Sequence, residues 1–282
     1  MSNELLKKWN DQGYCSVKNM FTKDEAKELL KICNRIKDQS SSYDLSLSEG
    51  RSANSHCMRH LNHPGYFENN DQEYKTFMNS ICDDRVMSIV NTILDGHPYF
   101  RCTSYFFDQQ EKHEDGNWHR DSQFGIENIE KEKEKILADA SKPVTSVQMQ
   151  IALEPSEDIE FVPTSQRRWD TNEEMHIRLG NDKENCKSNN MPNAMRFKQE
   201  PGDMIAFNPF GLHRGRYHTD KTRRTLMLTF SSSPIFDFFT DQPWFINDEK
   251  LNLLPENSKA FYQGFIEIFK NQWIDKHELA IS

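Results

Sequence analysis

A tripeptide near the middle of the chain has residue types that bind a divalent metal. His119 and Asp121 are separated by one residue, and residues two apart in an extended segment point to the same side. A neutral imidazole and a carboxylate suit iron(II), and one further ligand would complete a facial triad with open coordination positions. The preceding Asp115-Gly116-Asn117 is a turn signal, so a strand is expected to begin at Trp118. We predict that His119 and Asp121 bind a metal ion.

The third ligand should come from a distant segment that neighbours the first in space. His213 follows a Pro-Gly-Asp turn, a short apolar run and a second turn, whereas His218 lies in a polar turn. The tripeptide His113-Glu114-Asp115 repeats the histidine–acid spacing, but it precedes the turn and lies in a charged run. We therefore predict His213 as the third ligand and expect His113 to be exposed.

A pair of arginines follows the third histidine at the start of a β-rich run. On a strand, Arg223 and Thr225 face one way, and Arg224 faces the other way with apolar side chains. A guanidinium offers a bidentate fork to a carboxylate, and a threonine hydroxyl adds one more donor. We predict that Arg223, assisted by Thr225, binds a carboxylate ligand, and Arg224 is the alternative.

Further polar residues on predicted strands are weaker candidates for the same site. Gln148 and Gln150 share one face of an otherwise apolar run, where polar side chains often face a binding site. Thr103 and Tyr105, on an earlier strand, are predicted to reach the same ligand. Four arginines are candidates for a local positive patch that would suit a carboxylate- or phosphate-bearing substrate, although surface solvation is the expected role of at least half of them: Arg167, Arg168, Arg196 and Arg216.

Short β-rich runs separated by Pro and Gly predict a sandwich or barrel in the middle of the chain. These runs are Tyr99 to Asp108, Thr145 to Glu154, Asp158 to Pro163, Asp203 to Asn208 and Arg223 to Ser231. Helical periodicity predicts helices that begin after Thr22 and cover Asp84 to Leu94 and Ser258 to Trp273. Thr22 and Glu25 fit a capping box.

We expect one domain over residues 1–282, with a helical region at about 1–98, a β core at about 99–232 and a helical segment at 233–282. The charge-rich stretch Glu127 to Ala140 is predicted to be an exposed, partly helical insertion, which could act as a lid. Asn181 to Asn193 is predicted to be a polar loop.

The amino-acid composition argues against several classes of function. A net charge of -9 argues against nucleic-acid binding, which needs a basic face. No run of about 18 apolar residues predicts a membrane span. Six scattered cysteines and a polar start to the chain indicate reduced thiols and a cytoplasmic location. No feature of the sequence indicates an oligomeric state.

Taken together, these segments resemble the phytanoyl-CoA dioxygenase family over most of the chain. Trp118-His119-Arg120-Asp121 matches the family's His-x-Asp ligand motif, and the run from Pro201 through His213-Arg214-Gly215 to Arg223-Arg224-Thr225 is similar to its distal ligand and cosubstrate arginine. Phe161 to Gln166 is similar to the family's "VPGSH" turn, with Thr164 and Gln166 replacing its Gly and His.

The resemblance implies a double-stranded β-helix core, which is a jelly-roll, cupin-like fold, and an oxygenase that uses Fe(II), 2-oxoglutarate and O2. His119, Asp121 and His213 would bind iron, and Arg223 or Arg224 would pair with 2-oxoglutarate, which is converted to succinate and CO2. Related halogenases carry a small residue in place of the carboxylate ligand, so Asp121 predicts hydroxylation, desaturation or oxidative cyclisation instead. We expect the substrate to be a small biosynthetic metabolite, because no basic cluster suggests a CoA ester.

Two other functions fit part of the pattern. A cupin-like isomerase or hydrolase would use the same metal without needing Arg223 or 2-oxoglutarate. A binding protein with a vestigial site would lose some stability, but no activity, on His213→Ala. The metal ligands together with a carboxylate clamp favour the oxygenase.

Overall fold

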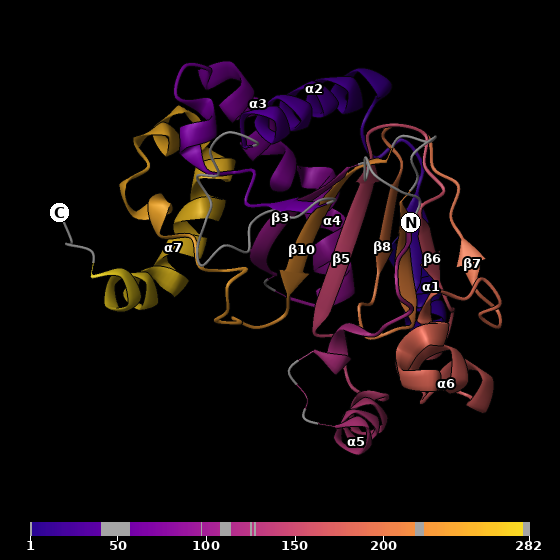
Figure 1. The fold of residues 1–282 in the computed structure, drawn as a ribbon. Helices are drawn as coiled ribbons and strands as arrows, with labels where there is room; N and C mark the ends of the chain where they lie inside the picture. The colour runs from indigo at the N-terminus through magenta and orange to yellow at the C-terminus, as the bar shows by residue number, and fades with distance from the viewer. Residues whose placement is uncertain are drawn as a thin grey trace.

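Two antiparallel sheets form the centre of the computed structural model, which describes residues 2–40, 57–96, 98–107, 114–124, 126, 128–217 and 223–278 (Figure 1). The larger sheet has the strand order β1-β8-β5-β10-β3-β2, and the smaller has the order β4-β9-β6-β7. The strands are β1 (Tyr14–Val17), β2 (Cys57–Arg59), β3 (Tyr99–Phe107), β4 (Glu114–Asp115), β5 (Ser146–Ala152), β6 (Ile159–Phe161), β7 (Met195–Arg196), β8 (Met204–Phe207), β9 (His213–Tyr217) and β10 (Arg224–Ser231).

The helices lie mostly to one side and at the ends of these sheets (Figure 1). They are α1 (Ser2–Gln12), α2 (Lys23–Ser40), α3 (Asp71–Ile81), α4 (Asp84–Leu94), α5 (Ile129–Asp139), α6 (Asn172–Leu179) and α7 (Glu256–His277). The predicted capping box is present: the Thr22 amide donates to Glu25 Oε2 at 2.6 Å, and the Glu25 amide donates to Thr22 Oγ1 at 3.2 Å.

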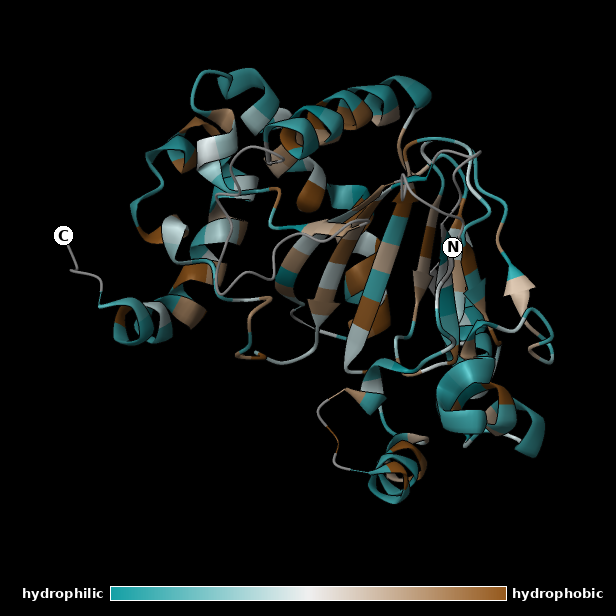
Figure 2. Cartoon of the chain, in the orientation of Figure 1, coloured by the Kyte–Doolittle hydropathy of each residue, from teal (hydrophilic) through white to brown (hydrophobic). Residues whose placement is uncertain are grey.

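The two faces of the larger sheet have different surroundings. In β10, Leu226 and Leu228 belong to the main hydrophobic core, which also draws side chains from α1, α2, α3, α4 and α7. The alternate residues Thr225, Met227 and Thr229 face the other way. Figure 2 shows hydrophobic and hydrophilic residues alternating along β5, as this arrangement requires. A second cluster, made by Tyr14, Ile159, Phe161, Phe197, Ile205 and Phe207, joins the two sheets.

The five predicted β runs are confirmed, and antiparallel sheets with helices at both ends agree with the expected fold class. The helical share is larger than a mainly β protein would have, because the sequence analysis missed α3 and α6. The Asn181 to Asn193 segment, predicted as a loop, begins with a 3-10 helix at Asn181–Lys187. Hydrogen bonding within the described ranges forms two separate sheets and not one closed barrel. None of the helices described here is both long and apolar enough to cross a lipid bilayer.

Candidate metal centre

His119, Asp121 and His213 converge on one point. Their ligand-type atoms all lie within 4.8 Å of one another. Asp121 Oδ1 is 3.5 Å from His119 Nε2 and 3.6 Å from His213 Nε2. Adjacent ligands of an octahedral ion stand about 3 Å apart when each metal–ligand bond is about 2.1 Å. The three side chains can therefore hold one ion after a small contraction.

Backbone pairing brings the two histidines together. The His119 amide donates to the His213 carbonyl at 3.1 Å, and the His213 amide donates to the His119 carbonyl at 3.0 Å. Arg120 is extended, with φ -119° and ψ 139°, whereas Asp121 begins a 3-10 turn, Asp121–Gln123. The expected strand through Asp121 is thus wrong beyond Arg120, but the extended Arg120 still leaves the two flanking side chains on one side.

The protonation states suit metal binding. The Nδ1 atoms of His119 and His213 lie 2.7 and 2.9 Å from the carbonyl oxygens of Asn117 and Gly211. A carbonyl can only accept, so each Nδ1 carries a hydrogen and each Nε2 faces the carboxylate, where it can serve as the metal-binding atom once it is deprotonated. Burial lowers the pKa of His213 to about 4, so this imidazole is neutral at neutral pH.

The pKa values of the other two ligands shift in opposite directions. Burial alone would raise the pKa of Asp121, but a hydrogen bond from His119 and nearby imidazole charge lower it overall. Burial would lower the pKa of His119, yet its hydrogen bond to Asp121 raises it overall. Asp121 is therefore a carboxylate, and an arriving cation would displace any proton on His119 Nε2.

Gln148 supports the carboxylate ligand from the larger sheet. Its Nε2 donates to Asp121 Oδ2 at 2.6 Å. This contact shows that the face of β5 that carries Gln148 is turned towards the candidate metal centre. The structure therefore places Gln148 beside a predicted iron ligand, and its contact with a cosubstrate stays a prediction.

Arg223 lies on the same side of the sheet as the metal ligands. Its side chain is buried over the Phe106 ring, 4.6 Å from the ring centroid. A Cβ built on Gly215 would lie 2.5 Å from Arg223 Nη1, so the guanidinium rests against the Gly215 backbone. Because Gly215 follows His213 by two residues in β9, it lies on the same face of that strand, roughly 7 Å along it.

Buried polar atoms beside Arg223 indicate a place for a polar ligand. Thr225 Oγ1 and Gln150 Oε1 are buried and have no hydrogen-bond partner among the described residues. Leaving such an atom unsatisfied costs about 1–3 kcal/mol. A carboxylate of bound 2-oxoglutarate would accept from the Thr225 hydroxyl, whereas the Gln150 oxygen needs a ligand that donates. The donor set of two histidines and an aspartate likewise fits Fe(II).

The sequence left open whether Arg223 or Arg224 binds the carboxylate ligand, and the side chains of these two arginines point in different directions. Arg224 Nη1 donates to the Arg223 carbonyl at 2.8 Å, and the Arg224 side chain is only partly buried. By strand alternation it shares its face with Leu226, on the side that packs against the helices. This geometry favours Arg223 over Arg224.

Two predicted site residues lie on the wrong face. Thr103 opposes Leu228, and Tyr105 opposes Leu226, in the pairing of β3 with β10. Thr103 Oγ1 donates to Asn62 Oδ1 at 3.1 Å, and the Tyr105 hydroxyl donates to Asn34 Oδ1 of α2 at 2.7 Å. The prediction that they reach the cosubstrate is wrong, because their faces alternate with those of Ser104 and Phe106.

Two of the four arginines of the candidate positive patch form ion pairs. Arg168 pairs with Glu174 at 2.6 Å, and Arg196 pairs with Glu160 at 3.0 Å. Sequence could not reveal the second pair, because Arg196 and Glu160 lie 36 residues apart in the chain. The rival histidines His113 and His218 lie outside the described residues.

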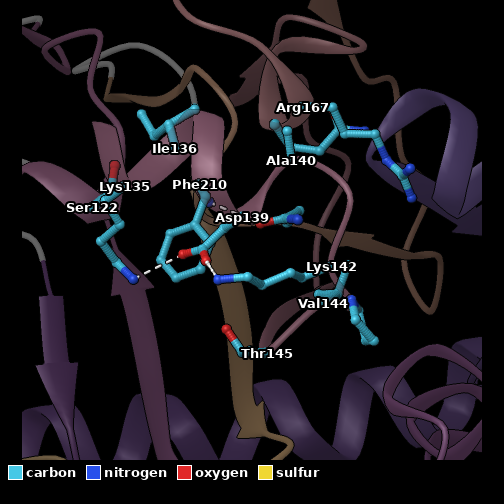
Figure 3. A pocket seen from close by; sticks show the side chains of 13 residues that line it. Ser122, Lys135, Ile136, Asp139, Ala140, Lys142, Val144, Thr145, Arg167 and Phe210 are labelled. Atoms are coloured by element: carbon cyan, nitrogen blue, oxygen red, sulfur yellow. Dashed lines mark hydrogen bonds and ion pairs between the residues drawn. The ribbon is translucent and has the colours of Figure 1, made fainter. Parts of the chain in front are cut away.

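A cavity lies between α5 and the segment that follows Asp121 (Figure 3). Its lining includes Ser122, Gln166 and Phe210 but none of the three metal ligands. Figure 3 shows Asp139 between Lys135 and Lys142, with Nζ–Oδ distances of 2.9 and 2.8 Å. The lining carries more positive than negative charge, because Lys135 and Lys142 share the carboxylate of Asp139 and Arg167 also lines the cavity. The lid role of Glu127 to Ala140 stays a prediction, although α5 does lie within that stretch.

A buried ion network fixes the segment that carries the ligands, and the sequence analysis missed it. Arg120 and Arg178 both pair with Asp170, at 2.6 and 2.7 Å. Arg178 also pairs with Glu132 of α5 at 2.9 Å, and Glu132 accepts a hydrogen bond from Ser122 at 3.0 Å. Arg120 lies between the candidate ligands His119 and Asp121, and Ser122 follows them. Both residues are thus held in place by this buried network.

We expect Asp170→Ala to lower the free energy of unfolding by about 3–5 kcal/mol, because it leaves two buried guanidinium groups without their shared carboxylate. Urea unfolding followed by circular dichroism measures this change. Asp139→Ala, which removes a partly exposed carboxylate, should cost about 1 kcal/mol or less. Equal losses in the two variants would contradict the structural role given to Asp170.

We expect Gly215→Ala to weaken 2-oxoglutarate binding while iron affinity stays near that of the wild type. The added methyl would lie 2.5 Å from Arg223 Nη1 and would displace the guanidinium from its position against the Gly215 backbone. Calorimetric titration of the metal-loaded protein with 2-oxoglutarate measures the effect, with Gly264→Ala as the control because open space surrounds that position. Unchanged affinity in Gly215→Ala would remove Arg223 from the site.

Comparisons with known proteins give the family and the fold of this chain. A family model described as phytanoyl-CoA dioxygenase (PhyH) matches residues 9–225. A search of curated proteins found no match. Among solved structures, EctD from S. alaskensis with bound Fe is 14% identical and covers 86% of this chain and 82% of its own, with a TM-score of 0.59.

Two further solved structures are similar to this chain in fold. AviO1 from Streptomyces viridochromogenes Tue57 is 13% identical and covers 84% of this chain and 98% of its own, with a TM-score of 0.57. The non-heme alpha ketoglutarate dependent carbocyclase SnoK from nogalamycin biosynthesis is 13% identical and covers 82% of this chain and 84% of its own, with a TM-score of 0.55. At these identities the likeness is one of fold.

Proposed function

The chain belongs to the phytanoyl-CoA dioxygenase family of iron(II)/2-oxoglutarate-dependent dioxygenases, and we propose that His119, Asp121 and His213 hold its iron. The observation that carries this assignment is the convergence of the three ligand-type atoms within 4.8 Å. The hydrogen bonds from both Nδ1 atoms to backbone carbonyls support it, because they direct both Nε2 atoms inward.

In this proposal Arg223 binds the distal carboxylate of 2-oxoglutarate and Thr225 donates a further hydrogen bond. The position of the guanidinium beside Gly215 supports this role, since the cosubstrate would then lie between Arg223 and His213. Gln148 holds the outer oxygen of Asp121 and leaves the other oxygen for the metal. His213 is buried, whereas His119 and Asp121 are partly exposed, so bound cosubstrate and substrate would be needed to exclude water and strengthen each of these contacts.

The proposed reaction oxidises a small metabolite. Bound Fe(II) with 2-oxoglutarate and O2 supplies the oxidising chemistry, and succinate and CO2 are released. Related halogenases carry a small residue in place of this carboxylate ligand, which leaves room for halide. This chain has Asp121 at that position, so we propose hydroxylation, desaturation or oxidative cyclisation. A structure of EctD from S. alaskensis holds 2-oxoglutarate and 5-hydroxyectoine, and SnoK is described as a carbocyclase from nogalamycin biosynthesis. Both favour a small-molecule substrate here.

We also propose that the two sheets form the family's double-stranded β-helix and that the whole chain is one domain. The main hydrophobic core supports the second point, because it includes Trp9 of α1, Leu226 of β10 and Phe265 of α7. The N-terminal and C-terminal helices thus share one core with the sheet.

The experiment that tests the function is succinate release under turnover conditions. Purified protein is supplied with Fe(II), 2-oxoglutarate and O2, and each component is omitted in turn. Because many such enzymes turn over slowly without substrate, succinate should form above the rate of the His213→Ala variant and should require all three components. A metal-dependent reaction that is indifferent to 2-oxoglutarate would instead support a cupin-like isomerase or hydrolase.

A further inference from the structure

The Arg120 side chain lies behind the candidate metal centre. Arg120 is extended between His119 and Asp121, so its side chain points to the opposite side from theirs. It is 0% exposed, and an arginine is almost never fully buried unless its charge is paired and its donors find acceptors. The residue between the two candidate ligands is therefore more than a spacer.

All five N–H groups of the Arg120 guanidinium have an acceptor. Nε and Nη2 donate to Asp170 Oδ1 at 2.9 and 2.6 Å, and Nη2 also donates to the Arg168 carbonyl at 3.3 Å. Nη1 donates to two carbonyl oxygens, that of Ser165 at 2.7 Å and that of Phe210 at 2.6 Å. One planar group thus joins the ligand segment to residues 165–170 and to residue 210.

The Phe210 carbonyl belongs to the loop that leads to His213. On one side of Phe210, the Pro209 carbonyl accepts a hydrogen bond from the Asp121 amide at 2.9 Å. On the other side, the Gly211 carbonyl accepts one from His213 Nδ1 at 2.9 Å. Because Phe210 lies between the two residues that make these contacts, a guanidinium that fixes its carbonyl helps to fix both of them.

Ser165 connects Arg120 to the same loop a second time. Its carbonyl accepts from Arg120, and its Oγ accepts from the Leu212 amide at 2.8 Å and donates to the Val162 carbonyl at 2.6 Å. Ser165 is 0% exposed, so water cannot readily replace these bonds. The loop before His213 is therefore held at two places by groups that Arg120 contacts.

The backbone pairing of residues 119 and 213 does not by itself fix the metal-binding atoms. Those two hydrogen bonds set the separation of the backbones, whereas a side chain can still turn about its own bonds. The direction of the His213 ring depends on the Gly211 carbonyl, and the position of the carboxylate depends on the turn that begins at Asp121. A shift of residues 209–212 relative to this turn would separate the donor atoms and weaken metal binding.

We propose that Arg120 is a positioning residue that sets the geometry of the iron site by holding residues 209–212 against the segment that carries His119 and Asp121. This inference rests on the proposed function, because it takes the three candidate ligands as the iron ligands. The role suits arginine, because its planar fork presents five donors in fixed directions. Lysine would keep the charge but offers one nitrogen with three donors on a flexible stem.

The test compares Arg120→Lys with Arg178→Lys. Arg178 is 1% exposed and pairs with the other oxygen of Asp170 at 2.7 Å. Within the described residues it donates only to side chains, those of Asp170, Glu132 and Gln123, and it does not reach residues 209–212. Both variants should unfold at a lower urea concentration than the wild type, because both disturb the same buried ion network. Only Arg120→Lys should change the metal site.

Metal binding is measured on the folded apoproteins by anaerobic titration with Fe(II), and separately with Co(II), whose visible absorption reports the coordination geometry. Arg120→Lys should bind Fe(II) about 10- to 100-fold more weakly than the wild type, and its Co(II) spectrum should change in shape. Arg178→Lys should keep the affinity and the spectrum of the wild type. A residue that served stability alone would leave both readouts unchanged.

Two results would overturn the inference: wild-type metal binding in a destabilised Arg120→Lys protein, or an equal loss of affinity in both variants. If Arg120→Lys does not fold, Ser165→Ala takes its place, because it removes the acceptor of the Leu212 amide without removing a charge. Ser165→Ala should bind Fe(II) about 10-fold more weakly, and unchanged binding would again overturn the inference. A wild-type protein that binds neither metal would contradict the proposed function as well, so the two failures are distinguishable.

Discussion

Replacing Arg223 with glutamine is expected to weaken 2-oxoglutarate binding by roughly 30-fold to several thousand-fold. Removing one partner of a buried, hydrogen-bonded charge pair costs about 2–5 kcal/mol, and each 1.4 kcal/mol is tenfold in Kd. The Arg223 side chain is 1% exposed and rests against the backbone of Gly215, so water cannot readily replace it. Iron affinity should change little, because Arg223 is not a ligand.

The matched control for this prediction is Arg224→Gln. Arg224 is its chain neighbour and carries the same charge, but it shares the helix-packed face with Leu226 and donates to a backbone carbonyl. Calorimetry with 2-oxoglutarate on the metal-loaded variants should find a near-normal Kd for Arg224→Gln. The opposite order of effects would assign the cosubstrate to Arg224, and equal small effects would remove both arginines from the site.

His213→Ala is expected to abolish tight iron binding. Changes to residues that only orient metal ligands typically cost about 10- to 100-fold in metal affinity, so loss of a ligand should cost more. His213 is 6% exposed, and its ring stands 5.0 Å from that of Phe207. The variant should nevertheless fold, because the pairing of residues 119 and 213 uses backbone groups only.

Anaerobic equilibrium titration with Fe(II) measures this loss, and circular dichroism checks the fold. His176→Ala is a suitable control, because that histidine is exposed on α6 and lies outside the three-ligand cluster. A His213→Ala protein that binds iron as tightly as the wild type would show that another residue completes the site. Loss of stability without any change in metal binding would favour the non-catalytic binding protein.

The sequence could identify site residues where residues close by in the chain show to which side the side chain points. His119 and Asp121 flank one extended residue after a turn, and Arg223 and Thr225 lie two residues apart at the start of β10, so local geometry already places each pair on one side. The Thr22 capping box and the limits of α4 likewise depend on contacts within a few residues. The same reasoning failed at Thr103 and Tyr105, because period-two alternation groups residues by face but does not say which face meets the metal.

Features that depend on distant segments were beyond the sequence. Asp170 contacts Arg120 from 50 residues away, and no pattern near either residue marks that ion pair. Position 215 needs a glycine only because the Arg223 guanidinium packs against the backbone of β9 there, and the sequence does not show that contact. The ion pair of Arg196 with Glu160 is a further example, because these two residues meet only in the folded chain.

The most direct measurement for the central claim is an anaerobic spectral titration of the protein with Fe(II) and then 2-oxoglutarate. If His119, Asp121 and His213 hold iron and Arg223 orients the cosubstrate, a metal-to-cosubstrate charge-transfer band in the visible region should grow to one equivalent of each. It should be missing from His213→Ala and should require a higher 2-oxoglutarate concentration in Arg223→Gln. A wild-type protein that binds iron yet develops no such band would contradict the account.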